Sequence, residues 1–156
     1  MSQIPASARE LRQSAKHMYR QAETLRADVA GGYGSLLLRF YGIECHMKDI
    51  YLVHTMRRPQ GDTDDIPKGT FGRSGHDLQA GLKSLRIPCW LPEVEKMKIP
   101  GKPRYTPGSA EPLRTDKIVE IEEAHQVWRY GIANEGSEVA GVWLDALIQW
   151  LRTQHP

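Results

Sequence analysis

The sequence predicts an all-α protein, an up-down bundle of four to five helices with two long loops, in which residues 1–156 form a single domain. Three observations predict this class. Apolar residues recur at helical spacing over several long stretches, no stretch shows a convincing strand-like alternation, and glycine and proline gather in two irregular stretches, about 57–75 and 87–115. A chain of this length is sufficient for one hydrophobic core.

The first helix is predicted from a heptad seam. Its apolar positions lie alternately four and three residues apart, at Leu11, Ala15, Met18, Ala22, Leu25 and Val29. Ser7 is expected to cap the helix, because Glu10 follows three residues later and completes a capping box. Gly31 and Gly32 are expected to end it.

The second helix, about residues 33–56, is the most apolar. One stripe consists of Leu36, Phe40, Ile43, Met47 and Ile50, and the adjacent one of Leu37, Tyr41, Glu44, Lys48 and Tyr51 or Leu52. Two largely apolar stripes are typical of a helix that has neighbours on more than one side. We therefore expect this helix at the centre of the bundle.

A short helix is predicted after the first irregular stretch, with Ser74 or Asp77 as its cap. The buried side of this helix is marked by Leu78, Leu82 and Leu85. Further helices are expected over about 116–128 and after a turn at 129–136, where Ser137 would cap the last one. The apolar face of this last helix is formed by Val139, Val142, Trp143, Ala146, Leu147, Trp150 and Leu151.

The composition argues against several classes of protein. The net charge is only +2, so a polyanion partner must be recognised through local clusters of charge. Two cysteines are too few for a typical disulfide-stapled domain, no signal peptide is evident, and no apolar run approaches the ~20 residues of a membrane span. We expect a cytoplasmic protein with reduced thiols and no contact with membranes.

Chemically active residues cluster within Glu44-Cys45-His46-Met47-Lys48. Because successive helical residues are about 100° apart, Cys45 and His46 should diverge, which argues against a cysteine–histidine dyad. His46 and Asp49 would supply only two ligands, so no metal is expected, and nothing indicates a cofactor.

Glu44 points to where the bundle packs, and a buried carboxylate needs a partner. Lys48 is the local candidate and Arg129 the distant one. Glu44 then either ties the helices in register or belongs to a polar site. If Glu44 belongs to a polar site, His76 joins these three residues around one pocket that suits a phosphate-bearing ligand. If Glu44 only ties the helices in register, His76 is a histidine at a helix start that fixes its loop.

The second irregular stretch is rich in basic residues. Lys96, Lys98, Lys102 and Arg104 lie close together, and Tyr105 adds an aromatic ring. Such a segment suits a nucleic-acid backbone. The alternative is a solvated, proline-rich loop.

Three short motifs resemble HEPN domains in family order. The stretch from Tyr41 to Leu52, with Glu44 followed by Lys48, is similar to their second helix. Gly75-His76-Asp77-Leu78 resembles the Gly-His-Asp-Leu that opens a short helix, and Arg129-Tyr130-Gly131 resembles the turn before their last helix. The resemblance covers roughly residues 30–153.

The resemblance implies an all-α bundle, often a homodimer, that works on RNA or with nucleotide-handling partners. Catalytic members of the family carry an arginine followed, after four to six residues, by a histidine. Arg129 departs from that pattern, because no histidine stands at positions 134–136. Arg39 and His46 do match the spacing and share one helical face, but they lie in the wrong helix for the family.

We therefore expect a non-catalytic or divergent HEPN-like protein that binds RNA or a nucleotide, or serves as a subunit of a bacterial defence or toxin–antitoxin assembly. The first alternative is an active, metal-independent ribonuclease with a nonstandard site at Glu44, Lys48, His76 and Arg129. The second is a structural dimerisation module that offers the face of the last helix, including Trp143 and Trp150, to a partner.

Overall fold

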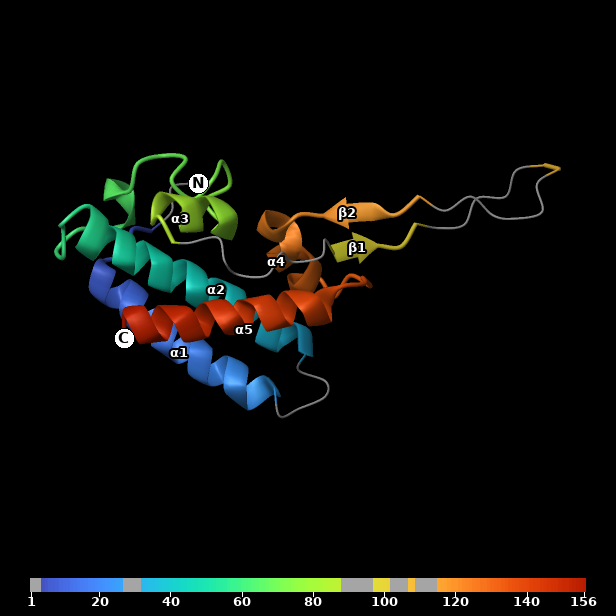
Figure 1. The fold of residues 1–156 in the computed structure, drawn as a ribbon, viewed down its shortest axis with the longest axis horizontal. Coiled ribbons are helices and arrows are strands. Elements are labelled where there is room, and N and C mark those ends of the chain that lie inside the picture. The colour runs from blue at the N-terminus through green and yellow to red at the C-terminus, as the bar shows by residue number, and fades with distance from the viewer. Residues whose placement is uncertain (1–3, 27–31, 88–96, 102–106, 109–114) are drawn as a thin grey trace.

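The computed structural model describes residues 4–26, 32–87, 97–101, 107–108 and 115–156, and most of them are helical (Figure 1). The elements in chain order are α1 (Ala8–Arg26), α2 (Gly32–Ile50), a π-helical turn (Tyr51–Thr55), a 3-10 turn (Thr63–Asp65), α3 (Leu78–Ser84), β1 (Met97–Ile99), β2 (Lys117–Val119), α4 (Ile121–Arg129) and α5 (Ser137–Gln154). The predicted helical class is confirmed, with the addition of a small two-stranded sheet.

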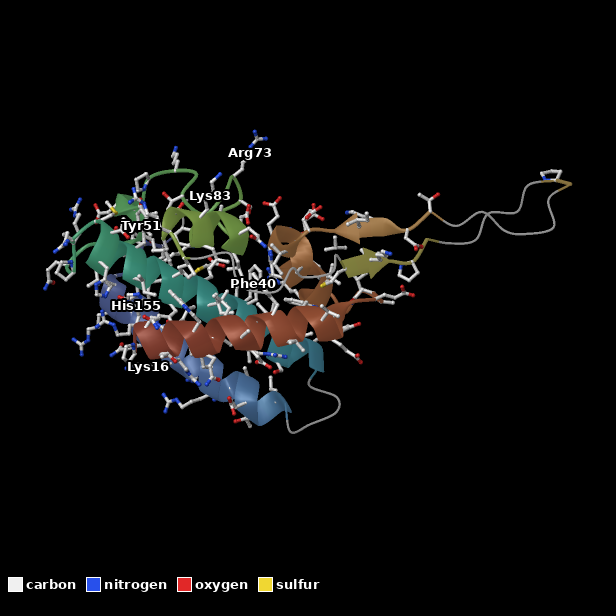
Figure 2. All side chains as sticks on the ribbon, viewed as in Figure 1. Lys16, Phe40, Tyr51, Arg73, Lys83 and His155 are labelled. Carbon is white, nitrogen blue, oxygen red and sulfur yellow. The ribbon has the colours of Figure 1, made fainter. Side chains whose placement is uncertain are left out.

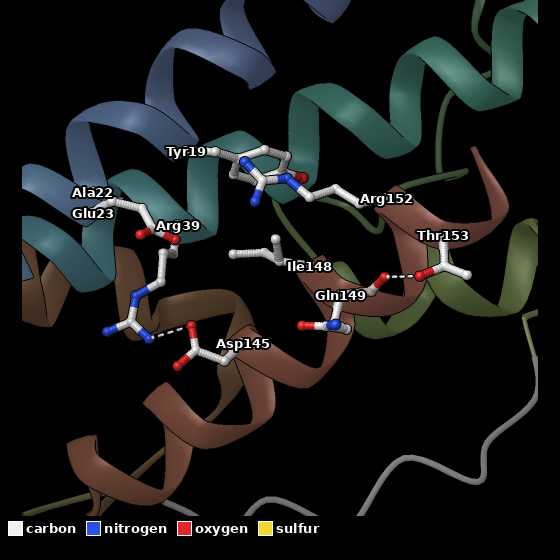
Figure 3. A pocket seen from close by; sticks show the side chains of 9 residues that line it. All are labelled: Tyr19, Ala22, Glu23, Arg39, Asp145, Ile148, Gln149, Arg152 and Thr153. Carbon is white, nitrogen blue, oxygen red and sulfur yellow. Dashed lines mark hydrogen bonds and ion pairs between the residues drawn. The ribbon is translucent and has the colours of Figure 1, made fainter. Parts of the chain in front are cut away.

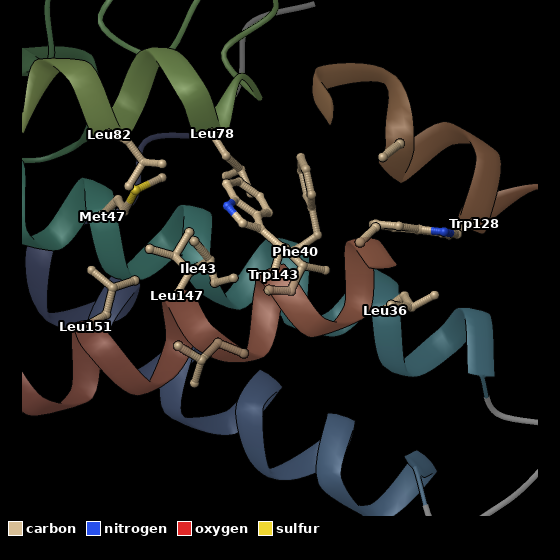
Figure 4. Packing of buried hydrophobic residues seen from close by; sticks show 14 of the residues in the cluster. Leu36, Phe40, Ile43, Met47, Leu78, Leu82, Trp128, Trp143, Leu147 and Leu151 are labelled. Atoms are coloured by element: carbon tan, nitrogen blue, oxygen red, sulfur yellow. The ribbon is translucent and has the colours of Figure 1, made fainter. Parts of the chain in front are cut away.

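Helix α2 lies at the centre of the bundle, as its two apolar stripes predict. It packs against α1, α3, α4 and α5. Phe40, Ile43 and Met47 are fully buried along α2 and meet side chains from three neighbouring helices (Figure 4). Each apolar side chain removed from water in this way contributes about 1.5 to 3 kcal/mol to folding.

The face of α5 that could have served a partner is instead turned into this core. Trp143, Leu147 and Leu151 are all at most 3% exposed, while Trp150 is half-buried. Trp143, Leu147 and Leu151 are therefore not available to a partner, whereas Val139 and Val142 of the same predicted face are 38% and 65% exposed. Because α2 has apolar side chains on several sides, the apolar side chains of α5 pack against it.

Helix α1 begins as its sequence predicts. The Ser7 hydroxyl accepts a hydrogen bond from the Glu10 amide at 3.2 Å, and the Glu10 carboxylate accepts one from the Ser7 amide at 2.8 Å. This reciprocal pair satisfies two backbone donors at the helix start. Gly31 lies outside the described residues, and Gly32 begins α2 rather than ending the first helix.

Helix α3 is capped by Asp77, whose carboxylate accepts a hydrogen bond from the Ala80 amide at 3.1 Å. Ser74, the other candidate, instead accepts from the His76 amide at 3.2 Å. Ser137 does not cap α5, because Gly136 occupies the cap position and adopts a positive φ of 95°. The Ser137 hydroxyl links the Trp128 indole to the Asn134 side chain.

A small antiparallel ribbon corrects the prediction that the chain has no strands. Met97 pairs with Val119 and Ile99 with Lys117, so β2 replaces the first turn of the helix predicted over 116–128. The ribbon projects from the α4 end of the bundle (Figure 1). Strands of three residues are too short for a period of two to be recognised, and their pairing depends on a distant segment.

Candidate functional site

Glu44 holds together a polar cluster on the α3 and α4 side of α2. The residue is only 7% exposed, and both carboxylate oxygens are used. Oε1 accepts a hydrogen bond from Lys48 Nζ at 2.7 Å, and Oε2 accepts one from His76 Nδ1 at 2.9 Å. The first contact follows from the i, i+4 spacing on one helix. The second bridges 32 positions and requires the tertiary fold.

Electrostatics keep this carboxylate ionised. Burial by itself would raise the pKa of Glu44, but the hydrogen bond from His76 and the charge of Lys48 outweigh it and hold the pKa below its ordinary value. Of the two predicted partners, the local one is correct: Lys48 pairs with Glu44, and no ion pair between Glu44 and Arg129 occurs among the described residues.

The contact with Glu44 also fixes the proton on the His76 ring. An ionised carboxylate only accepts hydrogen bonds, so Nδ1 must carry a hydrogen. In the neutral ring Nε2 is then left as an acceptor and available base. The local sequence helps to position the ring, since Gly75 turns the chain with a φ of 81° immediately before it.

His125 is the member of the cluster that the sequence reasoning missed. It extends from α4, its ring centroid lies 4.9 Å from that of His76, and it stacks on Phe40 at 5.4 Å. Tyr41 adds its ring at 6.0 Å. The spacing of four residues between His125 and Arg129 is the signal in the sequence that could have indicated a polar role.

His125 has an unsatisfied buried atom. The residue is only 7% exposed, and Nδ1 has no hydrogen-bond partner among the described residues. Burial, followed by the proximity of His76, lowers the pKa of His125. The Glu122 carbonyl opposes this shift, although its geometry falls short of a hydrogen bond to Nδ1. The ring is therefore neutral at pH 7, beside a second imidazole.

Arg129 borders the cluster without bonding to it. Its guanidinium is exposed and lies 5.7 Å from the ring centroid of Tyr130. It nevertheless acts on the site by its charge. Burial raises the pKa of Tyr41 and lowers that of His125; the positive charge of Arg129 lowers both. The cluster thus combines one carboxylate with two cations and two imidazoles.

Cys45 and His46 diverge, as the helical geometry predicts. His46 Nδ1 meets the Tyr19 hydroxyl at 3.1 Å, and its Nε2 meets the His155 carbonyl oxygen at 2.8 Å. The carbonyl only accepts, so Nε2 carries the hydrogen and Nδ1 accepts from Tyr19. Burial raises the pKa of the Cys45 thiol to about 11, which suppresses the thiolate.

Arg39 is bound elsewhere on α2. Its guanidinium donates to Asp145 at 2.9 Å and to the Gly141 carbonyl at 3.0 Å. It borders a pocket of about 430 Å³ between α1, α2 and α5, where the guanidinium of Arg152 lies over the Tyr19 ring at 4.9 Å (Figure 3). Arg39 and His46 therefore have separate sets of partners, although they share one helix.

Of the residues predicted to form the basic loop, Lys98 lies in the described part of the chain. Lys98 is exposed in β1, and its backbone amide and carbonyl bond to Glu135 at 3.0 and 2.8 Å. Lys96, Lys102, Arg104 and Tyr105 lie outside the described residues.

In the described part of the chain, no group of three or more His, Cys, Asp or Glu side chains is arranged to hold a metal ion. Nor does any helix in the described ranges have the length and apolar character needed to span a membrane. Searches of protein-family models, curated proteins and solved structures find no match for this chain.

Proposed function

We propose that this chain is a HEPN-like protein that binds RNA or a nucleotide through phosphate at the cluster around Glu44. The observation that carries the proposal is the Glu44 carboxylate held at once by Lys48 and His76, with the His125 ring beside it. Support also comes from the motifs that resemble HEPN domains. Glu44 and His76 belong to different motifs and form a hydrogen bond, and Arg129 of the third motif lies within electrostatic range of Tyr41 and His125.

The charges of the cluster favour an anionic ligand. Glu44 offsets one positive charge, and Lys48 and Arg129 supply two. Lysine and arginine both bind phosphate through charge-assisted hydrogen bonds. A purely structural tie would account for Lys48 and His76, which satisfy the two oxygens of Glu44, but it gives no reason for the His125 ring with its unsatisfied Nδ1 beside them.

The pair of imidazoles favours a second candidate function, a metal-independent ribonuclease. In this chemistry the 2′-oxygen of RNA forms a bond to phosphorus while the bond from phosphorus to the 5′-oxygen breaks. His76 Nε2 would accept the proton of the 2′-hydroxyl, since Glu44 orients the ring for this role. His125 would donate a proton to the leaving 5′-oxygen from its protonated fraction, which its lowered pKa keeps small at pH 7. The products are a 2′,3′-cyclic phosphate and a free 5′-hydroxyl.

Binding and cleavage are tested together with a labelled single-stranded RNA, with and without a chelator. We expect His76→Gln and Arg129→Ala to weaken RNA binding at low salt, whereas His17→Gln, an exposed histidine on α1, serves as the matched control. Should the protein cleave, His76→Gln or His125→Gln should slow cleavage by about 10² to 10⁴-fold, and the chelator should have no effect. Wild-type-like RNA binding by His76→Gln and Arg129→Ala would refute the proposed site.

A further inference from the structure

The loop that delivers His76 to the cluster contains a glycine at every third position. Its sequence runs Lys68-Gly-Thr-Phe-Gly-Arg-Ser-Gly75, and all three glycines have positive φ, at 88°, 73° and 81°. Gly72 cannot carry a side chain, because an added Cβ would lie 2.6 Å from Asp77 Cβ. The backbone therefore turns repeatedly and packs tightly against the start of α3.

This loop encloses a groove of about 740 Å³ beside the end of α2. That volume is within the range of small-molecule and cofactor sites. Lys48 forms part of its wall, so the groove adjoins the Glu44 cluster directly. The same ammonium that donates to Glu44 lies 5.4 Å from the centroid of the Phe71 ring in the loop.

The groove is supplied with unused hydrogen-bond donors. The backbone amides of Arg73, Ser74 and Gly75 donate to no acceptor within the described residues, and all three residues line the groove. The Ser74 hydroxyl oxygen accepts from the His76 amide, which leaves its own hydrogen available. Consecutive free amides in a glycine-rich turn form a concave surface that favours an anion.

The side chains of the groove are cationic. Lys68 and Arg73 both line it, are exposed, and form no ion pair among the described residues. Arg73 extends from the outer edge of the loop (Figure 2). Of the neighbouring acidic residues, Asp65 pairs with Arg58 at 3.1 Å. Asp62, Asp64 and Asp77 keep their negative charges, since Asp62 and Asp77 accept hydrogen bonds only from backbone amides, and none of the three lines the groove.

We infer that this groove is a phosphate-binding site, in which the amides of residues 73–75 and the side chains of Lys68 and Arg73 hold one phosphate group of a ligand that extends past Lys48 to His76. The inference rests on the proposed function, which it deepens by giving the ligand a second point of attachment. Phosphodiester groups of RNA and the terminal phosphates of a nucleotide share this chemistry, and the test separates the two sources.

The test compares Lys68→Ala/Arg73→Ala with the charge-matched control Arg20→Ala/Lys83→Ala, whose residues are exposed on α1 and α3 and lie outside the groove. Anisotropy of a labelled single-stranded RNA is measured over a range of salt concentrations. Loss of the contact with one phosphate should lower the slope of log K against log salt by about 0.7 and weaken binding about tenfold at low salt. Inorganic pyrophosphate and ATP are added as competitors in a second arm.

If ATP and pyrophosphate displace RNA from the wild-type protein but not from the groove variant, the site binds nucleotide phosphates. If RNA binds and neither competitor displaces it, the site binds phosphodiesters. A groove variant that behaves like the control overturns the inference. Comparison with His76→Gln separates the two proposals. Loss of binding only in the groove variant upholds the groove and refutes the Glu44 cluster, and loss only in His76→Gln does the reverse.

Discussion

The substitution Glu44→Gln tests whether the carboxylate at the centre of the site stabilises the fold by charge. The amide keeps the shape of the side chain but carries no charge, so the Lys48 ammonium loses its ionic partner and keeps at most a hydrogen bond to the amide oxygen. Removing one partner of a fully buried ion pair costs about 3 to 5 kcal/mol. The side chains of Lys48 and His76 are 18% and 33% exposed and partly regain water, so we expect a loss of about 2 kcal/mol in the free energy of unfolding.

The assay is thermal unfolding at pH 7 followed by circular dichroism. For a chain of this size a loss of about 2 kcal/mol lowers Tm by roughly 4 to 8 °C. The same substitution made in a Lys48→Met background should cost less than half as much, because no unpaired ammonium is left behind. An unchanged Tm for Glu44→Gln, or equal losses in the two backgrounds, would refute this reasoning.

The contribution of Glu44 to the free energy of unfolding should decrease as the pH falls. The pKa of Glu44 is lower in the folded protein than in the unfolded chain, so its contribution is fully present above about pH 4.3 and disappears as the pH falls through the folded-state value. The difference in Tm between wild type and Glu44→Gln should therefore be constant near neutral pH and shrink below about pH 4. A difference that grows on acidification would contradict the assignment of an ionised carboxylate.

Three further predictions concern the surroundings of the site. Tyr19→Phe removes the hydroxyl that donates to buried His46, and should cost about 1 to 2 kcal/mol by urea unfolding; an unchanged midpoint would contradict that hydrogen bond. Phe40→Ala empties a fully buried position and should cost about 3 to 5 kcal/mol by the same assay, whereas a loss below about 1 kcal/mol would argue against the central place of α2. In a Cys89→Ser background, Cys45 should react with a thiol reagent at pH 8 more than about a hundredfold slower than free cysteine, because its pKa is about 11; a rate like that of free cysteine would refute its burial.

The helical frame is a local property of this sequence. The heptad seam with its Ser7 and Glu10 capping box predicts the start of α1, and the double stripe predicts that α2 is central. The pairing of Glu44 with Lys48 is also local, because one helical turn fixes their separation. Such features depend on spacing within one element, which a single sequence records directly.

The remaining features depend on segments that are distant in the chain. The ribbon of β1 and β2 could not be predicted, because strands of three residues have no recognisable period and acquire their partners only in the folded chain. The apolar face of α5 is equally ambiguous in the sequence, where packing against α2 and packing against another protein require the same residues.

The sequence by itself determined which helices form and that Glu44 needs a cationic partner, since both follow from periodicity and from the cost of burying a charge. Only the tertiary structure decided the composition of the site. It brings His76 from 32 positions away to the second oxygen of Glu44, and it sets His125 of α4 beside that ring. It also leaves Arg129 exposed at the border of the site rather than paired with Glu44. The reason is physical: a carboxylate buried among several helices is satisfied by whichever donors those helices bring within reach, and the distance along the chain does not determine that choice.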